Sequence, residues 1–376
     1  MSSADDPLEL PASDPQPTAA PDGLPGINPY AASIDQSPLL AADLVATEVA
    51  PRRPHPGLGM AIVWTIVIAL AQIAFSLAVV VPVMVVVGLQ GKSGGQMQST
   101  LDSLQGVLLV GATLTTLVCA WGISRWMLGR DYLRLIGWRG FAPLQLLWVV
   151  LLVLPLGTTA GEVAAMADEV LPSFGAMLEE MSELPLWMIF VGGCLLPAVG
   201  EEIFFRGFVS RGVIGNYGVW IGALFTSLLF GLLHIDPVQI CGTIVLGLGF
   251  QYVFLTTRSL LLPIIGHLLN NMLAFAVVAM ADETSGDVPD EIEHVPLRAF
   301  LAGIAVLLPL LGLLYQTRTR WVLPDGSEWS ARFASCETPP QSLGAQPTSH
   351  SPQPLLLLAL LITYPLLVAA LLLLEV

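Results

Sequence analysis

The sequence predicts an all-α fold, a polytopic bundle of transmembrane helices behind a disordered acidic tail. Apolar residues make up 55% of the 376-residue chain, charged residues only 11%, and the mean hydropathy is +0.75. An average soluble domain carries about 25% charged residues. The apolar residues also gather in runs of about 20, the length that crosses a bilayer as a helix. These observations exclude an ordinary soluble globular enzyme.

The first element is a polar tail. Residues 1–56 hold 11 of the 29 prolines and eight acids, with no apolar periodicity. Such a segment cannot bury enough apolar surface to fold, so we expect a disordered, proline-rich cytoplasmic tail. The net charge of −15 argues against nucleic acid as a partner, because binding phosphate backbones needs clustered Lys and Arg.

Nine apolar runs follow, and eight or nine helical spans fit the pattern. They lie at about 60–89, 104–124, 143–160, 185–208, 217–235, 238–256, 260–281, 297–316 and 354–375. The sixth run contains Gly242, Gly247 and Gly249, which favour close packing between helices. We therefore expect a helical domain over 57–316, a loosely ordered polar loop over 317–353 and a C-terminal membrane helix over 354–376.

The basic residues predict the orientation. Of 14 Lys and Arg residues, all but Lys92 and Arg298 fall on one side of the predicted spans. Basic residues favour the cytoplasmic side. The segments 161–184 and 282–296 carry six acids each and no base, and both fall on the other side. We expect an integral protein of the cell (plasma) membrane, with its N-terminus cytoplasmic and its C-terminus outside.

Charged and histidine side chains inside the spans are the candidates for function. A charged residue at the centre of a span costs about 2.5–3.5 kcal/mol. Only Glu201 and Glu202 among the acids, and His234 and His267 among the histidines, lie well within apolar runs. Asp236 falls between two runs, where we expect a solvated turn.

The two glutamates have different neighbours in the sequence. Glu202 precedes Arg206 by four residues, the favourable order for an ion pair within a helix. Glu201 lies about 100° away around the helix and has no such partner. An unpaired carboxylate in the membrane favours taking up a proton, which is the task of a general base.

Two further pairs share helix faces at the same spacing. Phe230 and His234 are four residues apart, as are His267 and Asn271. A count of residues from the span ends allows Glu201 and both histidines to lie in one layer of the membrane. The combination favours a functional site, although a lone membrane histidine is as often a packing residue.

The three blocks Glu201-Glu202-xxx-Arg206, Phe230-xxx-His234 and His267-xxx-Asn271 resemble the motifs of the CAAX-prenyl endopeptidase and bacteriocin-processing (CPBP, or Abi) family. The resemblance covers a predicted protease core at 185–281. It implies an intramembrane endopeptidase that hydrolyses a membrane-associated or lipidated protein or peptide near its terminus. By the resemblance, Glu201 activates water, His234 assists, and His267 and Asn271 stabilise the oxyanion. Supporting positions are Glu202, Arg206 and Phe230.

Several alternatives remain open at this point. The mechanism implied by the family needs no cofactor, but Glu201, His234 and His267 also form a His₂Glu set that suits zinc. The same fold serves as a non-catalytic membrane scaffold or a bacteriocin immunity or resistance protein. A proton-coupled transporter also uses buried Glu and His, but it predicts inverted repeats, and the sequence shows none.

Overall fold

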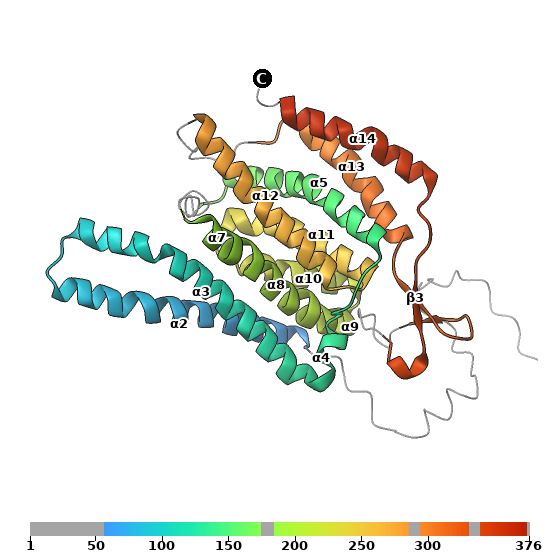
Figure 1. The fold of residues 1–376 in the computed structure, drawn as a ribbon, viewed down its shortest axis with the longest axis horizontal. Helices are drawn as coiled ribbons and strands as arrows, with labels where there is room; N and C mark the ends of the chain where they lie inside the picture. The colour runs from blue at the N-terminus through green and yellow to red at the C-terminus, as the bar shows by residue number, and fades with distance from the viewer. Residues whose placement is uncertain (1–55, 174–183, 286–293, 331–338, 374–376) are drawn as a thin grey trace, which may run out of the picture. The chain divides into compact units, whose positions relative to one another are not determined.

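A computed structural model describes residues 56–173, 184–285, 294–330 and 339–373, so the predicted tail lies outside the described residues apart from its last position. The predicted fold class is confirmed (Figure 1). Within the described part of the chain, seven helical stretches are long and apolar enough to cross a membrane. They are α2 (Leu58–Leu89), α3 to α4 (Gly94–Leu135), α5 (Pro143–Asp168), α7 to α9 (Leu186–Tyr217), α11 (Pro237–Thr257), α13 (Leu297–Gln316) and α14 (Pro354–Leu372).

The other two predicted spans are also helices, of which one is short. The run 217–235 corresponds to α10 (Val219–Leu232), and the run 260–281 begins α12 (Leu261–Ser285). At about 1.5 Å per residue, the 14 residues of α10 reach about 21 Å, less than a hydrocarbon core of about 30 Å. All nine predicted runs are therefore helical, and α10 is too short to cross a bilayer by itself.

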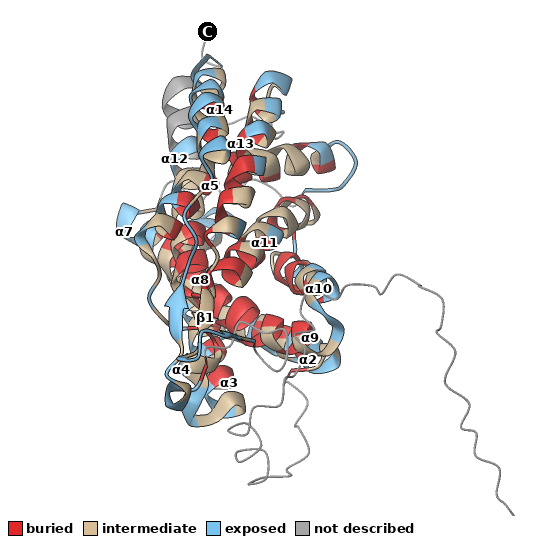
Figure 2. Ribbon diagram, turned by 90° about the vertical axis from the view of Figure 1, so that its right-hand side faces the viewer, coloured by how far each residue is buried: buried red, intermediate tan, exposed pale blue. Residues whose placement is uncertain are grey.

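The helices form two neighbouring groups. The α2–α3 hairpin packs through α3 on α8 (Leu196–Glu202), whereas α5 packs on α11, α12 and α13, and α14 covers α13 (Figure 1). Buried residues concentrate on α5, α8 and α11 (Figure 2). In the most apolar 18-residue window of each helix, 56% of the residues are buried in the α7–α9 stretch but only 6% in α2. The α7–α9 stretch is thus the centre of the bundle, and the outer helix presents its apolar side chains to lipid.

The predicted role of the glycines in α11 is confirmed. A Cβ atom at Gly242 would lie 3.0 Å from the carbonyl oxygen of Ala160 in α5. A Cβ at Gly247 would lie 3.0 Å from Cβ of Ser227 in α10, and one at Gly249 would overlap the Leu156 side chain. The small residues therefore allow α11 to approach helices on both sides.

The expectation of a loosely ordered loop at 317–353 is wrong for its described residues. They contain a three-stranded antiparallel sheet in the order β2-β1-β3. Its strands are β1 (Arg320–Val322), β2 (Glu328–Trp329) and β3 (Gln346–Thr348). The turn between β1 and β2 contains Pro324-Asp325-Gly326, residue types that favour tight turns, and Gly326 has a φ of 86°. The fold is therefore helical with one small sheet.

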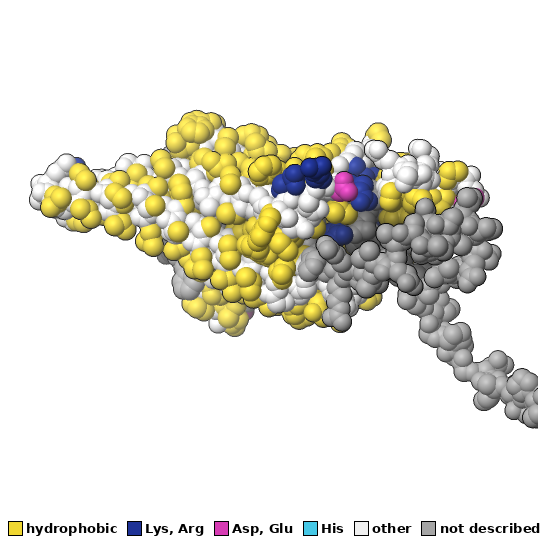
Figure 3. All heavy atoms as spheres, turned by 90° about the horizontal axis from the view of Figure 1, so that it is seen from below, with side chains coloured by type: hydrophobic (Ala, Val, Ile, Leu, Met, Phe, Trp, Pro, Cys, Tyr) yellow, Lys and Arg dark blue, Asp and Glu magenta, His cyan; other side chains and the backbone are white. Residues whose placement is uncertain are grey.

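The described arginines gather mainly at one end of the helices. Arg139 donates hydrogen bonds to the backbone carbonyls of Thr257 and Arg258, which joins the loop before α5 to the end of α11. Figure 3 shows basic side chains gathered on a face that is otherwise mostly hydrophobic. At the opposite end Arg298 donates to the carbonyl of Leu373, which joins the start of α13 to the end of α14. This division agrees with the distribution that the sequence predicted.

Candidate active site

The glutamate pair lies on a helix that is irregular on both sides. π-Helical segments, η2 (Ile189–Leu195) and η3 (Ile203–Val209), precede and follow α8, whose last two residues are Glu201 and Glu202. Short π-helical segments are rare and are frequent at functional sites. This irregular helix packs on α3 and α12, so the two carboxylates lie in the interior of the bundle.

The predicted pair of Glu202 and Arg206 is confirmed. Arg206 Nη1 lies 2.7 Å from Glu202 Oε1, and neither side chain is exposed. Arg206 Nη2 also donates to the carbonyl oxygen of Gly247 in α11 at 3.1 Å. The guanidinium carbon lies 4.4 Å from the centre of the Phe230 ring. A buried charge needs a partner and further hydrogen bonds, and Arg206 has both.

His267 joins this pair from α12. Its Nδ1 lies 3.0 Å from Glu202 Oε1, and the residue is only 4% exposed. A carboxylate can only accept, so Nδ1–H is the donor. Phe250 stacks on the imidazole with ring centres 5.4 Å apart, and Phe230 meets it edge-on at 5.7 Å. The ring of His267 is therefore fixed by one hydrogen bond and two aromatic contacts.

Glu201 differs from Glu202, as the sequence predicted. The Oε2 atoms of both carboxylates are buried without a hydrogen-bond partner among the described residues. The difference lies at Oε1 of Glu202, which contacts Arg206 and His267, whereas Glu201 receives no hydrogen bond from a described residue. Glu201 Oε2 lies 4.0 Å from His267 Nε2. The two ring nitrogens of His267 thus face two carboxylates, one in hydrogen-bond contact and one across a gap.

His234 lies outside the span to which the sequence assigned it. Helix α10 ends at Leu232, and His234 is half-buried in the turn that follows. Its Nδ1 lies 3.2 Å from the carbonyl oxygen of Phe230, and the two rings are 5.4 Å apart. Because a carbonyl oxygen only accepts, Nδ1–H is the donor here, and Nε2 of the neutral ring carries a free lone pair.

The expectation that Asp236 lies in a solvated turn is wrong. Asp236 is 6% exposed and caps the N-terminus of α11. Its Oδ1 accepts from the backbone N–H groups of Val238 and Gln239 at 2.9 and 3.0 Å. The physical reason is that the first N–H groups of a helix have no partner within the helix, so a side-chain acceptor is favoured there.

Asn271 lies one turn beyond His267 on α12 and contacts the other irregular segment. Its Nδ2 donates to the carbonyl oxygen of Gly193 in η2 at 3.2 Å. Pro197 is four residues after Gly193 and has no N–H, so it cannot satisfy that carbonyl as an ordinary helical residue would. Asn271 supplies the missing donor and links α12 to the helix that carries the glutamates.

The structure thus brings Glu201, Glu202, Arg206 and His267 together and connects His234 to them through Phe230. Sequence reasoning missed the contribution of α11, namely Phe250 and the Gly247 carbonyl. No signal marks Phe250, because an aromatic residue in an apolar span looks like any packing residue. Gly247 was identified only as a packing position.

The zinc alternative requires Glu201, His234 and His267 to lie around one point. Among the described residues, no group of three His, Cys, Asp or Glu side chains is placed to hold a metal ion. Glu201 and His267 face each other, but His234 does not complete a set with them. In the described arrangement these three side chains therefore do not come together as a His₂Glu set.

Comparisons with known proteins cover the same part of the chain. Residues 183–273 match the family model described as "Type II CAAX prenyl endopeptidase Rce1-like". A curated protein of Bacillus subtilis (strain 168), named "Putative membrane peptidase YdiL", is 28% identical over 96 residues, which is 26% of this chain. The matched region spans 38% of that relative's length. No solved structure gives a significant match.

The matched range 183–273 contains the positions Glu201, Glu202, Arg206, Phe230, His234, His267 and Asn271. Both comparisons thus point to a membrane peptidase. The match of residues 183–273 to the model of the Rce1-like type II CAAX prenyl endopeptidase family confirms the resemblance that the three motifs predicted.

Proposed function

We propose that this chain is an intramembrane endopeptidase in which Glu201 activates the attacking water. One observation carries the proposal: the buried Glu201 Oε2 has no hydrogen-bond partner among the described residues and faces His267 Nε2 at 4.0 Å. Two hydrogen bonds of about 2.8 Å each span that distance if they meet at about a right angle. The gap therefore fits one bridging water molecule, held by a base on one side and an imidazole on the other.

The hydrolysis proceeds without a covalent intermediate. Glu201 takes a proton from the water as its oxygen attacks the carbonyl carbon of the peptide bond. The C–N bond then breaks, and Glu201 returns the proton to the leaving amine nitrogen. The other proton of the water stays with the new carboxyl group. Glu202 takes no part in proton transfer, because Arg206 and His267 already bind its Oε1.

The histidines act on either side of this transfer. In its protonated form, His267 donates from Nδ1 to Glu202 and from Nε2 into the gap, where the oxyanion develops. Asn271 Nδ2 carries a second N–H besides the one given to Gly193, and that donor assists in the same role. His234 has an assisting role outside this gap: its Nε2 lone pair can accept a hydrogen bond, since its Nδ1–H is given to the carbonyl oxygen of Phe230.

The substrate and the orientation are part of the proposal. The seven apolar helices favour a substrate that is itself in or attached to the bilayer, a membrane protein or a lipidated peptide cleaved near its terminus. The arginine-rich end of the helices corresponds to the cytoplasmic face of the plasma membrane. The tail before α2 is then cytoplasmic, and the end of α14 lies outside.

The test is cleavage of a panel of membrane and lipidated peptides by the purified full-length protein in detergent. Glu201→Gln should lower the rate by at least about 100-fold, the contribution of a general base. Glu169→Gln is the matched control, because that acid also faces a histidine but is exposed and far from the site. It should leave the rate unchanged.

Each assay is repeated with a strong chelator and with added zinc, with the metal content measured in the same samples. Loss of activity on chelation and recovery with zinc would replace the metal-free mechanism by the zinc alternative. Full activity of Glu201→Gln would eliminate Glu201 as the base. Absence of cleavage across the panel, by protein that is folded, would favour the scaffold or immunity role.

A further inference from the structure

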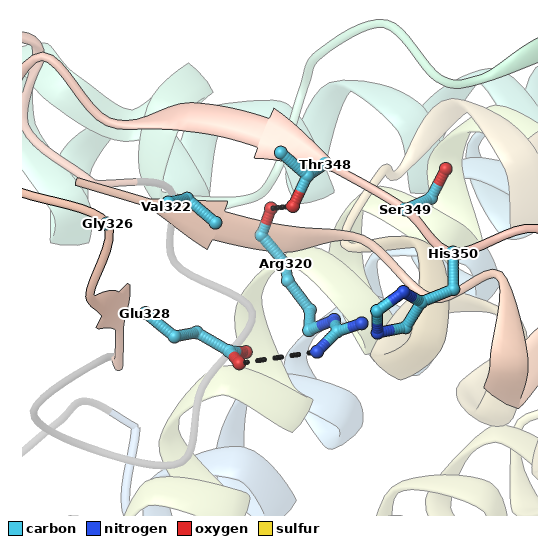
Figure 4. A pocket seen from close by; sticks show the side chains of 7 residues that line it. All are labelled: Arg320, Val322, Gly326, Glu328, Thr348, Ser349 and His350. Carbon is cyan, nitrogen blue, oxygen red and sulfur yellow. Dashed lines mark hydrogen bonds and ion pairs between the residues drawn. The ribbon is translucent and has the colours of Figure 1, made fainter. Parts of the chain in front are cut away.

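A polar groove lies outside the site described above, lined by the small sheet and by the two residues that follow β3 (Figure 4). Its volume is about 280 Å³. A second hollow of about 500 Å³ adjoins it and shares His350 with it. The polar side chains that line the first hollow are Arg320, Glu328, Thr348, Ser349 and His350.

Donors outnumber acceptors in this groove. Arg320 lies between Glu328 and His350 (Figure 4), and its Nη1 is 3.9 Å from Glu328 Oε2, too far for a hydrogen bond. Arg320 Nε is buried and has no hydrogen-bond partner among the described residues. The ring of His350 makes no hydrogen bond to a described residue, and Arg318 lines the adjoining hollow. In this groove one carboxylate therefore accompanies a guanidinium group and an imidazole, with the hydroxyls of Thr348 and Ser349 beside them.

The position of the groove indicates which anion is available there. Gln353 N, just before α14, donates to Oε1 of Gln316, the last residue of α13, at 3.0 Å. Both helices are apolar enough to cross a membrane, so the adjoining hollow, which Gln316 and Gln353 line, lies where they leave it. The groove shares His350 with that hollow. The Trp321 ring contacts the guanidinium of Arg139 at 5.0 Å, and aromatic and basic residues together are typical of the headgroup level. Phospholipid phosphates are concentrated at that level, and basic pockets between membrane helices bind anionic headgroups.

We propose that this groove binds the phosphate group of an anionic phospholipid. The guanidinium of Arg320 donates from Nε and one Nη, as its planar geometry favours for phosphate, and His350 donates from its ring. Ser349 and Thr348 supply hydroxyl donors at the rim. Glu328 remains beside Arg320 and limits the charge that the site accepts. The proposal concerns lipid binding and is independent of whether the chain cleaves peptides.

The test uses the purified full-length protein in detergent with phosphatidylglycerol as the probe and phosphatidylcholine as the uncharged comparison. Native mass spectrometry counts the bound lipids. We expect one tightly retained phosphatidylglycerol in the wild type and about 25-fold weaker retention in Arg320→Gln/His350→Gln, since each basic group near a headgroup contributes about fivefold. Arg130→Gln is the matched control, because this exposed arginine belongs to the same end of the molecule but not to the groove.

Three outcomes would overturn the proposal. They are equal retention by the double variant and the wild type, equal retention of the two lipids by the wild type, and binding of inorganic phosphate without retention of lipid. Thermal unfolding of each variant checks that it is folded. If the double variant does not fold, Arg320→Lys, which keeps the charge but loses the planar donors, and His350→Gln are measured singly with the same expectation of weaker retention.

Discussion

Two histidines in this molecule each lie between two glutamates, and the surroundings of the two clusters differ. At the exposed end, His294 contacts Glu162 Oε1 at 3.1 Å and Glu169 Oε1 at 2.9 Å. In the bundle, His267 contacts Glu202 at 3.0 Å but is 4.0 Å from Glu201. In the exposed cluster both ring nitrogens contact a carboxylate at hydrogen-bond distance. In the buried cluster only one does, and Arg206 binds the same carboxylate.

The difference shows what a reactive site needs beyond its residue types. At His294 both carboxylates are satisfied by the ring, so neither is available as a base, and water screens their charge. In the bundle Arg206 satisfies Glu202, and this leaves Glu201 opposite an imidazole with space for one small molecule. One histidine and two glutamates thus form a surface clamp in one place, with both glutamates bound to the ring, and a candidate catalytic centre in the other.

The largest expected effect comes from removing the arginine that only the buried cluster has. Arg206→Met leaves the Glu202 carboxylate buried without its countercharge, and breaking such a pair costs about 3–5 kcal/mol in the free energy of unfolding. Unfolding of the purified protein in detergent measures this loss. The double variant Glu202→Gln/Arg206→Met should regain most of it, because no unpaired charge remains. If the single variant is as stable as the wild type, the buried ion pair does not account for the difference between the two clusters.

A smaller effect is expected from the aromatic ring that stacks on His267, a contact that His294 lacks among the described residues. Phe250 and Phe254 are both 1% exposed and lie one turn apart on α11, but only Phe250 stacks on His267. We expect Phe250→Leu and Phe254→Leu to lower stability alike, by about 1 kcal/mol. Only Phe250→Leu should also lower kcat, by about tenfold with KM unchanged, since an aromatic pair contributes up to about 1.5 kcal/mol. Equal kcat values for the two variants would remove Phe250 from the positioning of His267.

The smallest effect belongs to the exposed cluster and depends on pH. The Glu162 carboxylate, and then Glu169, hold the pKa of His294 above its ordinary value through hydrogen bonds to the ring. A raised pKa in the folded state means that the clamp stabilises the protein fully below the ordinary histidine pKa. The contribution is lost as pH rises through the folded-state pKa. The difference in Tm between the wild type and His294→Gln should therefore be positive at acidic pH and shrink as the pH is raised. A difference that grows with pH would show that the ring is not held as an imidazolium.

The sequence predicted the buried cluster well because its members are costly where they lie. Glu201, Glu202 and His267 occur in apolar runs, and such residues are rare there without a function. The pairing of Glu202 with Arg206 followed from helical spacing alone. Phe250 has no such cost, so its contact with His267 depends on how α11 and α12 pack together, which one sequence does not reveal.

Other features were missed for different reasons. Asp236 followed by Pro237 is a typical start of a helix, so the cap on α11 could have been predicted from the chain itself. The sheet at Arg320–Val322 depends on pairing with Gln346–Thr348, which are distant in the sequence. The strand Gln346–Thr348 has no apolar alternation that would predict it. The exposed clamp at His294 joins residues more than a hundred positions apart.

The two π-helical segments around α8 make this site depend on length as well as on residue type. A π turn contains more residues than an α turn, so η2 and η3 each accommodate extra chain without a break in the helix. Deleting one residue between Glu202 and Arg206 would move Arg206 by about 100° around the helix relative to Glu202. The two side chains would then be three residues apart instead of four, and the geometry of their 2.7 Å ion pair would change. An alignment that scores only the identities of the motif residues would regard such a shortened chain as intact, whereas the contacts of Glu202 would have changed.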